Sequence, residues 1–330
     1  MPASARIPGR VLLAPAWALV SGLLLVAGAH VVGFDRNRMF EFADAYTLWI
    51  YLPAYFIAVA AASFRHYLLA IAAAVVVVAQ CCWVIPPMLQ RVSIPAAARS
   101  APHFRVVSAN LNYGNDHHTQ ALAELEADDA DVLVLEEITP AWWQAIEHSA
   151  LFASHHYFAR AMRADAGGIA LLSRTPLTDV VQHDTEGWPV FTAAISVGGR
   201  RVHLVGVHTV APLLFGRNHR QEQEITSIVR GMPGPRIVAG DFNASPYNRW
   251  FHQLLGLGLH EAHDAVGRPF ATTWPNGTHH HLPPLRLDHL FADPALVPLR
   301  AAEGRGTGSD HRPIIVDLAV VPGADPLREK

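Results

Sequence analysis

Three long apolar runs lie in the first quarter of this chain. They cover residues 11–34, 45–64 and 66–85, and the charged residues lie between the runs rather than inside them. Each run is about 20 residues or slightly longer, enough for a helix to cross roughly 30 Å of hydrocarbon. A cleaved signal peptide gives one such run, not three in series. We therefore expect a membrane domain with three transmembrane helices at residues 1–86, with a buried helical bundle as the alternative.

The composition changes after the third run. Residues 86–102 have proline at both ends and small residues between, which is typical of an extended linker. Short β-rich runs follow, with helical patterns between some of them at residues 119–127 and 218–230. The sequence thus predicts a linker at 87–103, a soluble domain at 104–321 and a tail at 322–330. The β-rich runs are residues 104–111, 131–138, 168–174, 191–197, 201–209, 235–243, 287–293 and 312–320.

The order of these runs bears on the fold. Residues 191–209 form two consecutive runs joined only by Gly198 and Gly199, which predict a hairpin turn. Strands that follow one another without a helix argue against a purely parallel sheet. Two packed sheets with helices outside, a four-layer α/β/β/α sandwich, fit the pattern better.

Charge and cysteine content exclude few functions. The formal net charge is −3, so the chain lacks the polybasic character of a dedicated nucleic-acid binder. The only cysteines are Cys81 and Cys82, adjacent within the third apolar run. No disulfide framework is possible elsewhere, and the redox compartment stays open.

Polar side chains follow the ends of the apolar runs repeatedly. The first runs end in Asn110 with Asn112, and in Glu136 with Glu137. Only one of the two glutamates is expected on the face of a site, because strand side chains alternate. Later runs end in or begin near His208, Asp241, Asn243, Asp288, Asp310 and His311. Asp241 and Asn243 are two residues apart, so both are expected to face one point.

These groups are the ones that phosphodiester hydrolysis requires. A divalent cation must hold the phosphate, a base must take a proton from water, and donors must stabilise the pentacoordinate state. Magnesium-like ions prefer oxygen ligands, mostly carboxylates. Each residue alone has a structural explanation as a turn former, a solvated edge or a satisfied core group, but the whole series at strand ends indicates a catalytic site.

The residues that carry a family resemblance are spread over the whole soluble domain. They are "ANLN", "LEEI", "GGIALLSRTPL", "GVHTVAP", "GDFN", "RLDHLF" and "SDHRP". With them, residues 104–321 resemble the endonuclease/exonuclease/phosphatase family, whose DNase I-like fold is shared by nucleases, inositol polyphosphate phosphatases and neutral sphingomyelinases. Membrane helices before such a domain resemble a bacterial subgroup of largely unassigned substrate.

The resemblance implies a role for each matching residue. Glu137 is similar to the family's main metal ligand, with Asn110 beside it and Asp310 as a second acid on the metal side. Asp241 and Asn243 resemble the pair that orients water and contacts phosphate. His311 resembles the catalytic histidine, Asp288 the carboxylate that orients it, and His208 a histidine that contacts phosphate. The chain departs from the family in having Glu136 where glutamine is frequent, and Asn112 where some repair nucleases have aspartate.

These expectations define a membrane-anchored phosphoesterase that uses Mg²⁺, with Mn²⁺ or Ca²⁺ possible, on phosphodiester or phosphomonoester bonds. The substrate could be a phospholipid, an inositol phosphate or a nucleic acid, and a nuclease is the main alternative. A non-catalytic binding protein on the same scaffold is an alternative of another class. Arg6 and Arg10 before the first span, and Arg65 in the second loop, favour a cytoplasmic N-terminus and a periplasmic or extracellular catalytic domain in a bacterial inner membrane, although Arg36 and Arg38 oppose this.

Overall fold

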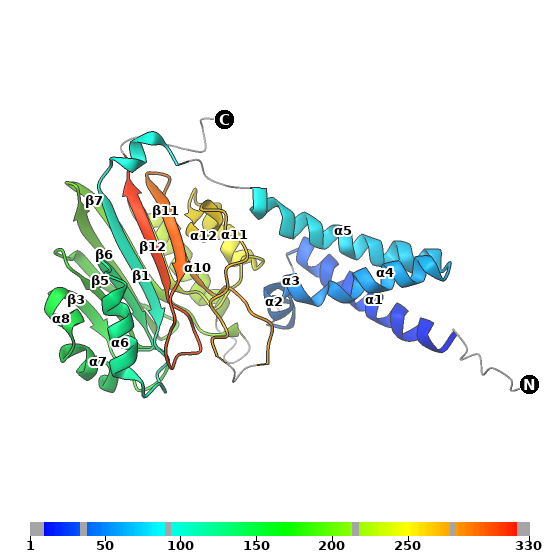
Figure 1. Ribbon diagram of the computed structural model, residues 1–330, viewed down its shortest axis with the longest axis horizontal. Helices are drawn as coiled ribbons and strands as arrows, with labels where there is room; N and C mark the ends of the chain where they lie inside the picture. Colours follow the sequence, from blue (N-terminus) through cyan, green and yellow to red (C-terminus); the bar gives the residue numbers. More distant parts are fainter. Residues whose placement is uncertain (1–9, 34–37, 90–93, 213–217, 278–280, 322–330) are drawn as a thin grey trace, which may run out of the picture. The chain divides into compact units, whose positions relative to one another are not determined.

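The computed structural model describes residues 10–33, 38–89, 94–212, 218–277 and 281–321. The chain divides into two compact units, Met1–Pro86 and Pro87–Lys330. The N-terminal unit contains helices and the C-terminal unit contains both sheets (Figure 1).

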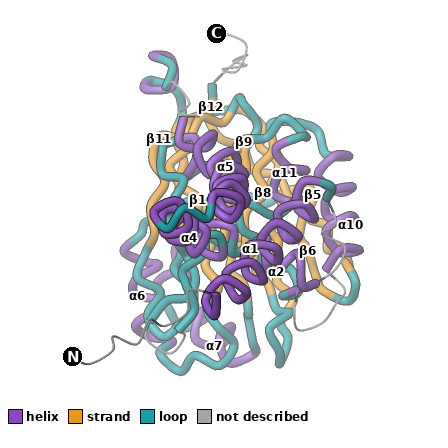
Figure 2. The backbone as a smooth tube through the Cα atoms, turned by 90° about the vertical axis from the view of Figure 1, so that its right-hand side faces the viewer, coloured by secondary structure: helices purple, strands orange, loops and turns teal. Residues whose placement is uncertain are grey.

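The N-terminal unit is built from apolar helices, drawn in purple in Figure 2. Its two long helices, α1 and α5, are each long and apolar enough to cross a membrane. The second predicted span, residues 45–64, corresponds to α3 and α4, and it is long enough to count as a third span only together with α2, which a short break bends by 77° against it. The helices are α1 (Arg10–Val31), α2 (Arg38–Ala45), α3 (Thr47–Ile50), α4 (Leu52–Ser63) and α5 (Tyr67–Leu89).

The C-terminal unit contains two six-stranded mixed sheets. The first has the strand order β11-β12-β1-β2-β4-β3 and the second β5-β6-β7-β8-β10-β9. The first consists of β1 (His103–Asn110), β2 (Val132–Glu136), β3 (Tyr157–Ala161), β4 (Ile169–Ser173), β11 (Leu296–Glu303) and β12 (Ile314–Val320). The second consists of β5 (Thr178–Thr185), β6 (Trp188–Val197), β7 (Arg200–His208), β8 (Arg236–Asp241), β9 (His260–Glu261) and β10 (Asp288–Ala292).

Three apolar cores define four layers. One core lies between the sheets and joins residues such as Val134 and Leu171 of the first sheet to Leu204 and Leu290 of the second. A second core packs helices against the first sheet, and a third packs helices against the second sheet. The predicted α/β/β/α sandwich is therefore confirmed. The helices are α6 (His118–Ala127), α7 (Pro140–Glu147), α8 (Ala150–Ser154), α10 (Asn218–Gly231), α11 (Arg249–Leu255) and α12 (Ala262–Ala265).

Elements that the sequence did not predict lie mostly at the sheet edges. Strands β3, β5, β9 and β11 each end a sheet order. An edge strand needs no apolar pattern on both faces, and β11 even contains Pro298, which edge positions tolerate. Part of the predicted linker is also not extended, because Ala96–Arg99 form a 3₁₀ helix and Ala98 packs against Val297 and Ala319.

Candidate active site

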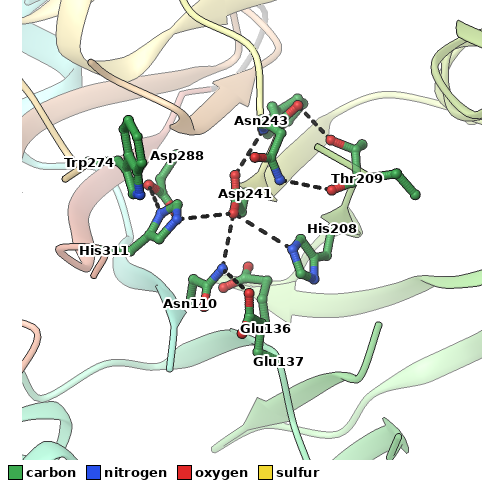
Figure 3. A network of polar contacts seen from close by, with 12 residues as sticks. Asn110, Glu136, Glu137, His208, Thr209, Asp241, Asn243, Trp274, Asp288 and His311 are labelled. Carbon is green, nitrogen blue, oxygen red and sulfur yellow. Dashed lines mark hydrogen bonds and ion pairs between the residues drawn. The ribbon is translucent and has the colours of Figure 1, made fainter. Parts of the chain in front are cut away.

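Three polar residues form one row across the second sheet. Strands β7 and β8 run parallel with His208 opposite Asp241, and β10 runs antiparallel with Asp288 opposite the same Asp241. All three side chains are buried. Figure 3 shows Asp241 at the centre of the polar network. The sheet register alone therefore brings together residues that lie up to 80 positions apart in the chain.

His311 reaches this row from the other sheet. It lies in the loop before β12, and its Nδ1 is 2.9 Å from Asp288 Oδ2 while its Nε2 is 3.6 Å from Asp241 Oδ2. Burial lowers the pKa of His311, but the carboxylates of Asp288, Asp241 and Asp310 outweigh it and raise that pKa well above the usual range. The surrounding carboxylates thus favour the imidazolium form of His311, in which Nδ1 donates to Asp288.

Asp241 accepts contacts from several directions. Asn110 Nδ2 donates to its Oδ2 at 3.0 Å, and the Asn243 backbone N–H donates to its Oδ1 at 2.9 Å. His208 Nε2 lies 3.7 Å from Oδ2. Burial, only partly offset by His311, raises the pKa of Asp241 to about 6. A carboxyl with such a pKa can exchange a proton near neutral pH.

The Asp241–Asn243 pair is close for a reason that the sequence did not predict. Strand β8 ends at Asp241, and Asn243 has a left-handed backbone with φ of 48°. Its Nδ2 donates to the Thr209 carbonyl at 2.8 Å. The expectation that strand alternation aligns the two residues was wrong, because Asn243 is already outside the strand. Before Asp241, Gly240 has φ of 150°, and a Cβ there would lie 1.7 Å from the Val207 carbonyl oxygen, so only glycine fits.

Glu137 and Glu136 both point toward this region. Glu137 has φ of 62°, and its carboxylate accepts from Asn110 Nδ2 at 3.1 Å and from the Tyr113 N–H at 2.8 Å. Glu136 is fully buried and accepts from Ser108 Oγ at 2.8 Å. The expectation that only one glutamate faces the site was wrong, because the left-handed turn at Glu137 breaks the strand alternation.

The two glutamates differ in charge. Burial raises the pKa of Glu136 well above its usual range, and Asp288 and Asp241 add to the effect. Burial also raises the pKa of Glu137, but the hydrogen bonds from Tyr113 and Asn110 oppose it. The neutral form is therefore favoured more strongly at Glu136 than at Glu137, and Glu137 is the better candidate for an ionised ligand.

Asp310 lies next to His311 at the edge of the site. Its Oδ1 accepts from Asn112 Nδ2 at 2.8 Å and its Oδ2 from Trp274 Nε1 at 3.1 Å. Burial raises the pKa of Asp310, but His311 and these two donors outweigh it, so the net shift is downward. Asp310 is therefore ionised.

The donor set suits a divalent cation. Besides the buried Glu136, the site combines the carboxyl groups of Glu137, Asp241, Asp288 and Asp310 with two histidines, so negative charge is in excess. Ligand atoms of Asp241, Asp288 and His311 lie within 4.8 Å of one another. Since Asp288 is already hydrogen-bonded to His311, the oxygens of Glu137 and Asn110 are the more suitable ligands for a hard ion.

Residues 273–276 contact Asp288, Asp310 and the loop before β12, and the sequence did not predict these contacts. Thr273 Oγ1 accepts from the Asp288 backbone N–H at 3.1 Å, and Trp274 Nε1 donates to Asp310. Asn276 Nδ2 contacts several carbonyls between Arg305 and His311, with distances from 2.7 to 3.3 Å. These contacts join residues about 15 to 35 positions apart, and no local pattern marks them.

A buried charged cluster lies behind the start of β10. Arg286, two residues before Asp288, has its NH2 2.7 Å from Asp264 Oδ1 and its NH1 3.4 Å from Glu261 Oε2. His263 bridges Glu261 and Glu303, at 3.1 Å from each. Although burial lowers the pKa of His263, the two glutamates raise it overall, so the histidine adds a positive charge to the cluster.

Replacing Arg286 by methionine is expected to lower the free energy of unfolding by about 3–5 kcal/mol, because Glu261 and Asp264 would keep buried charges without their partner. The matched control is Arg268→Met, since the Arg268 side chain is 43% exposed in its ion pair with Glu303 and should contribute less than about 1 kcal/mol. Denaturant titration followed by tryptophan fluorescence measures both variants. A loss below about 1 kcal/mol for Arg286→Met would show that the ion pairs of Arg286 do not stabilise the domain.

The comparisons with known proteins agree with this geometry. Residues 107–311 match the Endonuclease/Exonuclease/phosphatase family. Two Vibrio cholerae proteins, both named UPF0294 protein, are 28% identical over 208 residues, covering 59% of this chain and 70% of theirs.

Solved structures share the fold at low sequence identity. The structure of D. rerio TDP2 complexed with single strand DNA product has a TM-score of 0.54 and 16% identity, covering 66% of this chain and 98% of that one. The 3'-5' exonuclease NExo from Neisseria meningitidis has a TM-score of 0.51 and 19% identity, covering 65% and 99%. Because the family match also spans more than half of the chain, the protein belongs to the endonuclease/exonuclease/phosphatase family of phosphoester-hydrolysing enzymes.

Proposed function

We propose that the protein is a membrane-anchored, divalent-metal-dependent hydrolase of phosphodiester or phosphomonoester bonds. The observation that carries this proposal is the convergence of His311, Asp288 and Asp241 from two sheets, with His311 Nδ1 2.9 Å from Asp288 and Nε2 directed at Asp241. A buried imidazolium beside a carboxyl with a pKa of about 6 supplies a proton donor and a proton acceptor together.

In this proposal each side chain has one task. Asp241 orients a water molecule and accepts its proton, while Asn243 and His208 contact the phosphate. His311, oriented by Asp288, donates a hydrogen bond to the phosphoryl oxygens as negative charge develops on them. Glu137 and Asn110 would hold a Mg²⁺ ion with Asp310 on the same side, and the ion would neutralise phosphate charge.

The test uses the full-length chain in detergent with bis(4-nitrophenyl) phosphate. Hydrolysis is expected with Mg²⁺ or Mn²⁺, to stop with EDTA and to return when metal is added. Asp241→Asn should remove most of the activity. Hydrolysis that survives EDTA and the Asp241 variant alike would contradict the proposal.

A nuclease remains the second candidate. Its support is that the fold neighbours include a structure with single strand DNA product and a 3'-5' exonuclease. Cleavage of single-stranded DNA at a higher kcat/KM than any other natural phosphoester would favour it. Against it stands the overall charge of −3, since polynucleotide binders rely on clusters of cations.

Membrane anchoring and orientation are part of the same proposal. If the bent pair between α1 and α5 counts as one span, the chain crosses the membrane three times. The N-terminus and the catalytic domain then lie on opposite sides of the membrane. Arg6, Arg10 and Arg65 favour a cytoplasmic N-terminus. We therefore expect a C-terminal alkaline phosphatase fusion to be active in the periplasm. A reporter active only in the cytoplasm would reverse this orientation.

A further inference from the structure

His289 follows Asp288 in β10, but its side chain lies on the opposite face of the sheet. Phe291, two residues further along the strand, belongs to the core between the second sheet and its helices, and strand side chains two residues apart share a face. The His289 imidazole is completely buried, and its centroid is 5.0–5.7 Å from the ring centroids of Phe242, Phe251 and Phe291. His289 is therefore separate from the row of polar side chains that contains Asp288.

One short polar contact explains why a histidine lies among these phenylalanines. His289 Nε2 is 2.8 Å from the Ala244 carbonyl oxygen, and because a carbonyl oxygen only accepts, Nε2 donates. On the other side of the ring, Nδ1 lies 3.7 Å from Glu261 Oε1. Burying an imidazole among apolar rings is unfavourable, unlike burying a leucine, unless hydrogen bonds compensate. The distinct contribution of His289 is therefore its hydrogen bond to Ala244.

Ala244 belongs to the loop that carries Asn243, and a second residue holds the same loop. This residue is Thr209, which directly follows β7. Its Oγ1 donates to the Phe242 carbonyl at 2.5 Å, and its own carbonyl accepts from Asn243 Nδ2 at 2.8 Å (Figure 3). The two backbone carbonyls that Thr209 and His289 hold, those of Phe242 and Ala244, are thus the ones on either side of Asn243 in the chain.

The conformation of this loop determines where two site residues point. Asn243 has φ of 48°, a left-handed conformation that is disfavoured for a residue with a side chain and persists where the surroundings fix it. In this conformation its backbone N–H donates to Asp241 Oδ1 at 2.9 Å. If Asn243 left the left-handed region, the Asp241 carboxylate would lose this donor, so both side chains depend on how the loop is held.

We propose that Thr209 and His289 are a pair of positioning residues that fix the turn at Asn243, and through it the orientation of Asp241 and Asn243. Each directly follows a member of the row of polar side chains, and each acts through a backbone carbonyl of the loop without touching the substrate. The inference rests on the proposed phosphoester hydrolysis, in which Asp241 orients water and Asn243 contacts the phosphate.

The experiment replaces each donor in the full-length protein. His289→Leu removes the hydrogen bond and leaves an apolar side chain, and it should lower kcat on bis(4-nitrophenyl) phosphate by about tenfold, the effect of one lost hydrogen bond. His289→Gln places an amide N–H₂ near the position of Nε2 and should restore most of this loss. The affinity for Mg²⁺, measured by isothermal titration, should stay unchanged in both variants, because the proposed ligands Glu137 and Asn110 belong to the first sheet.

A second pair of variants and a control accompany these. Thr209→Val removes only the hydroxyl and should also lower kcat by about tenfold, whereas Thr209→Ser keeps the donor and should retain activity. His260→Leu is the matched control. His260 is also a buried histidine of the second sheet, and its Nε2 is 3.1 Å from the Leu296 carbonyl, but Leu296 lies in β11, outside the site. This variant should lose stability without losing kcat.

Hydrogen exchange provides a readout that does not depend on activity. The amides of residues 242–245 should exchange faster in His289→Leu and Thr209→Val than in the wild type, and at the wild-type rate in His260→Leu. Unchanged exchange in the first two variants, or an equal loss of kcat in His260→Leu, would overturn the positioning pair. Absence of hydrolysis by the wild-type protein with every divalent metal would instead overturn the proposed phosphoesterase, and exchange would still decide whether the pair fixes the loop.

Discussion

His311→Ala is expected to lower kcat on bis(4-nitrophenyl) phosphate by about 10²–10³-fold, the loss typical when a donor that stabilises developing negative charge is removed. The variant removes the imidazolium whose pKa the surrounding carboxylates raise. Steady-state kinetics at saturating Mg²⁺ measures the loss, and circular dichroism checks that the fold is kept. A loss below tenfold would exclude His311 from the chemical step.

Asp288 should act through His311. Its Oδ2 is 2.9 Å from Nδ1 of that ring, so Asp288→Asn should cost somewhat less activity than His311→Ala. The double variant should be little worse than His311→Ala alone, because residues that work as a unit have non-additive effects. Fully additive losses in this double-mutant cycle would show that the two residues act separately.

Glu137→Gln is expected to remove most of the activity and to weaken Mg²⁺ affinity, because the site loses a charged oxygen ligand. The fold should survive, since the glutamine amide can keep the contact with the Tyr113 N–H through its oxygen. Isothermal titration with Mg²⁺ measures the affinity. Unchanged affinity would remove Glu137 from the metal site.

The neighbouring glutamate provides a matched control. Glu136 is fully buried, and burial together with Asp288 and Asp241 raises its pKa well above the usual range, which favours the neutral carboxylic acid. Glu136→Gln is therefore nearly isosteric and isoelectric, and activity should change by less than about tenfold, well short of the loss expected for a catalytic acid or base. A Glu136 loss as large as that of Glu137→Gln would mean that the metal recruits both carboxylates.

The strands that could be predicted from the sequence are those that are apolar on both faces. The predicted runs at residues 104–111, 201–209 and 235–243 are central strands, apolar because both faces are covered. An edge strand such as β5, with the sequence TDVVQHDT, is mostly exposed and has no such signature. A strand can be predicted from a single sequence when both of its faces are buried, because its residues are then almost all apolar.

The sequence indicated which residues could belong to the candidate site, but not the backbone conformation at those residues. The strand-end positions of Asp241, Asp288 and His311 follow from the apolar runs before or after them. The left-handed backbones at Glu137 and Asn243 do not, because a period of two describes the chain only while it remains a strand. Contacts such as Trp274 to Asp310 depend on how loops far apart in sequence pack together.

The alignment of His208, Asp241 and Asp288 across three strands makes the candidate site depend on one strand register. If β8 slipped by one residue against its neighbours, Asp241 would turn to the opposite face and the whole row would be lost. Molecules trapped with such a slip would keep similar secondary structure and yet be inert. Specific activity after refolding would therefore measure the fraction of molecules with the correct strand register. Far-ultraviolet circular dichroism cannot measure this fraction, because it reports only secondary structure.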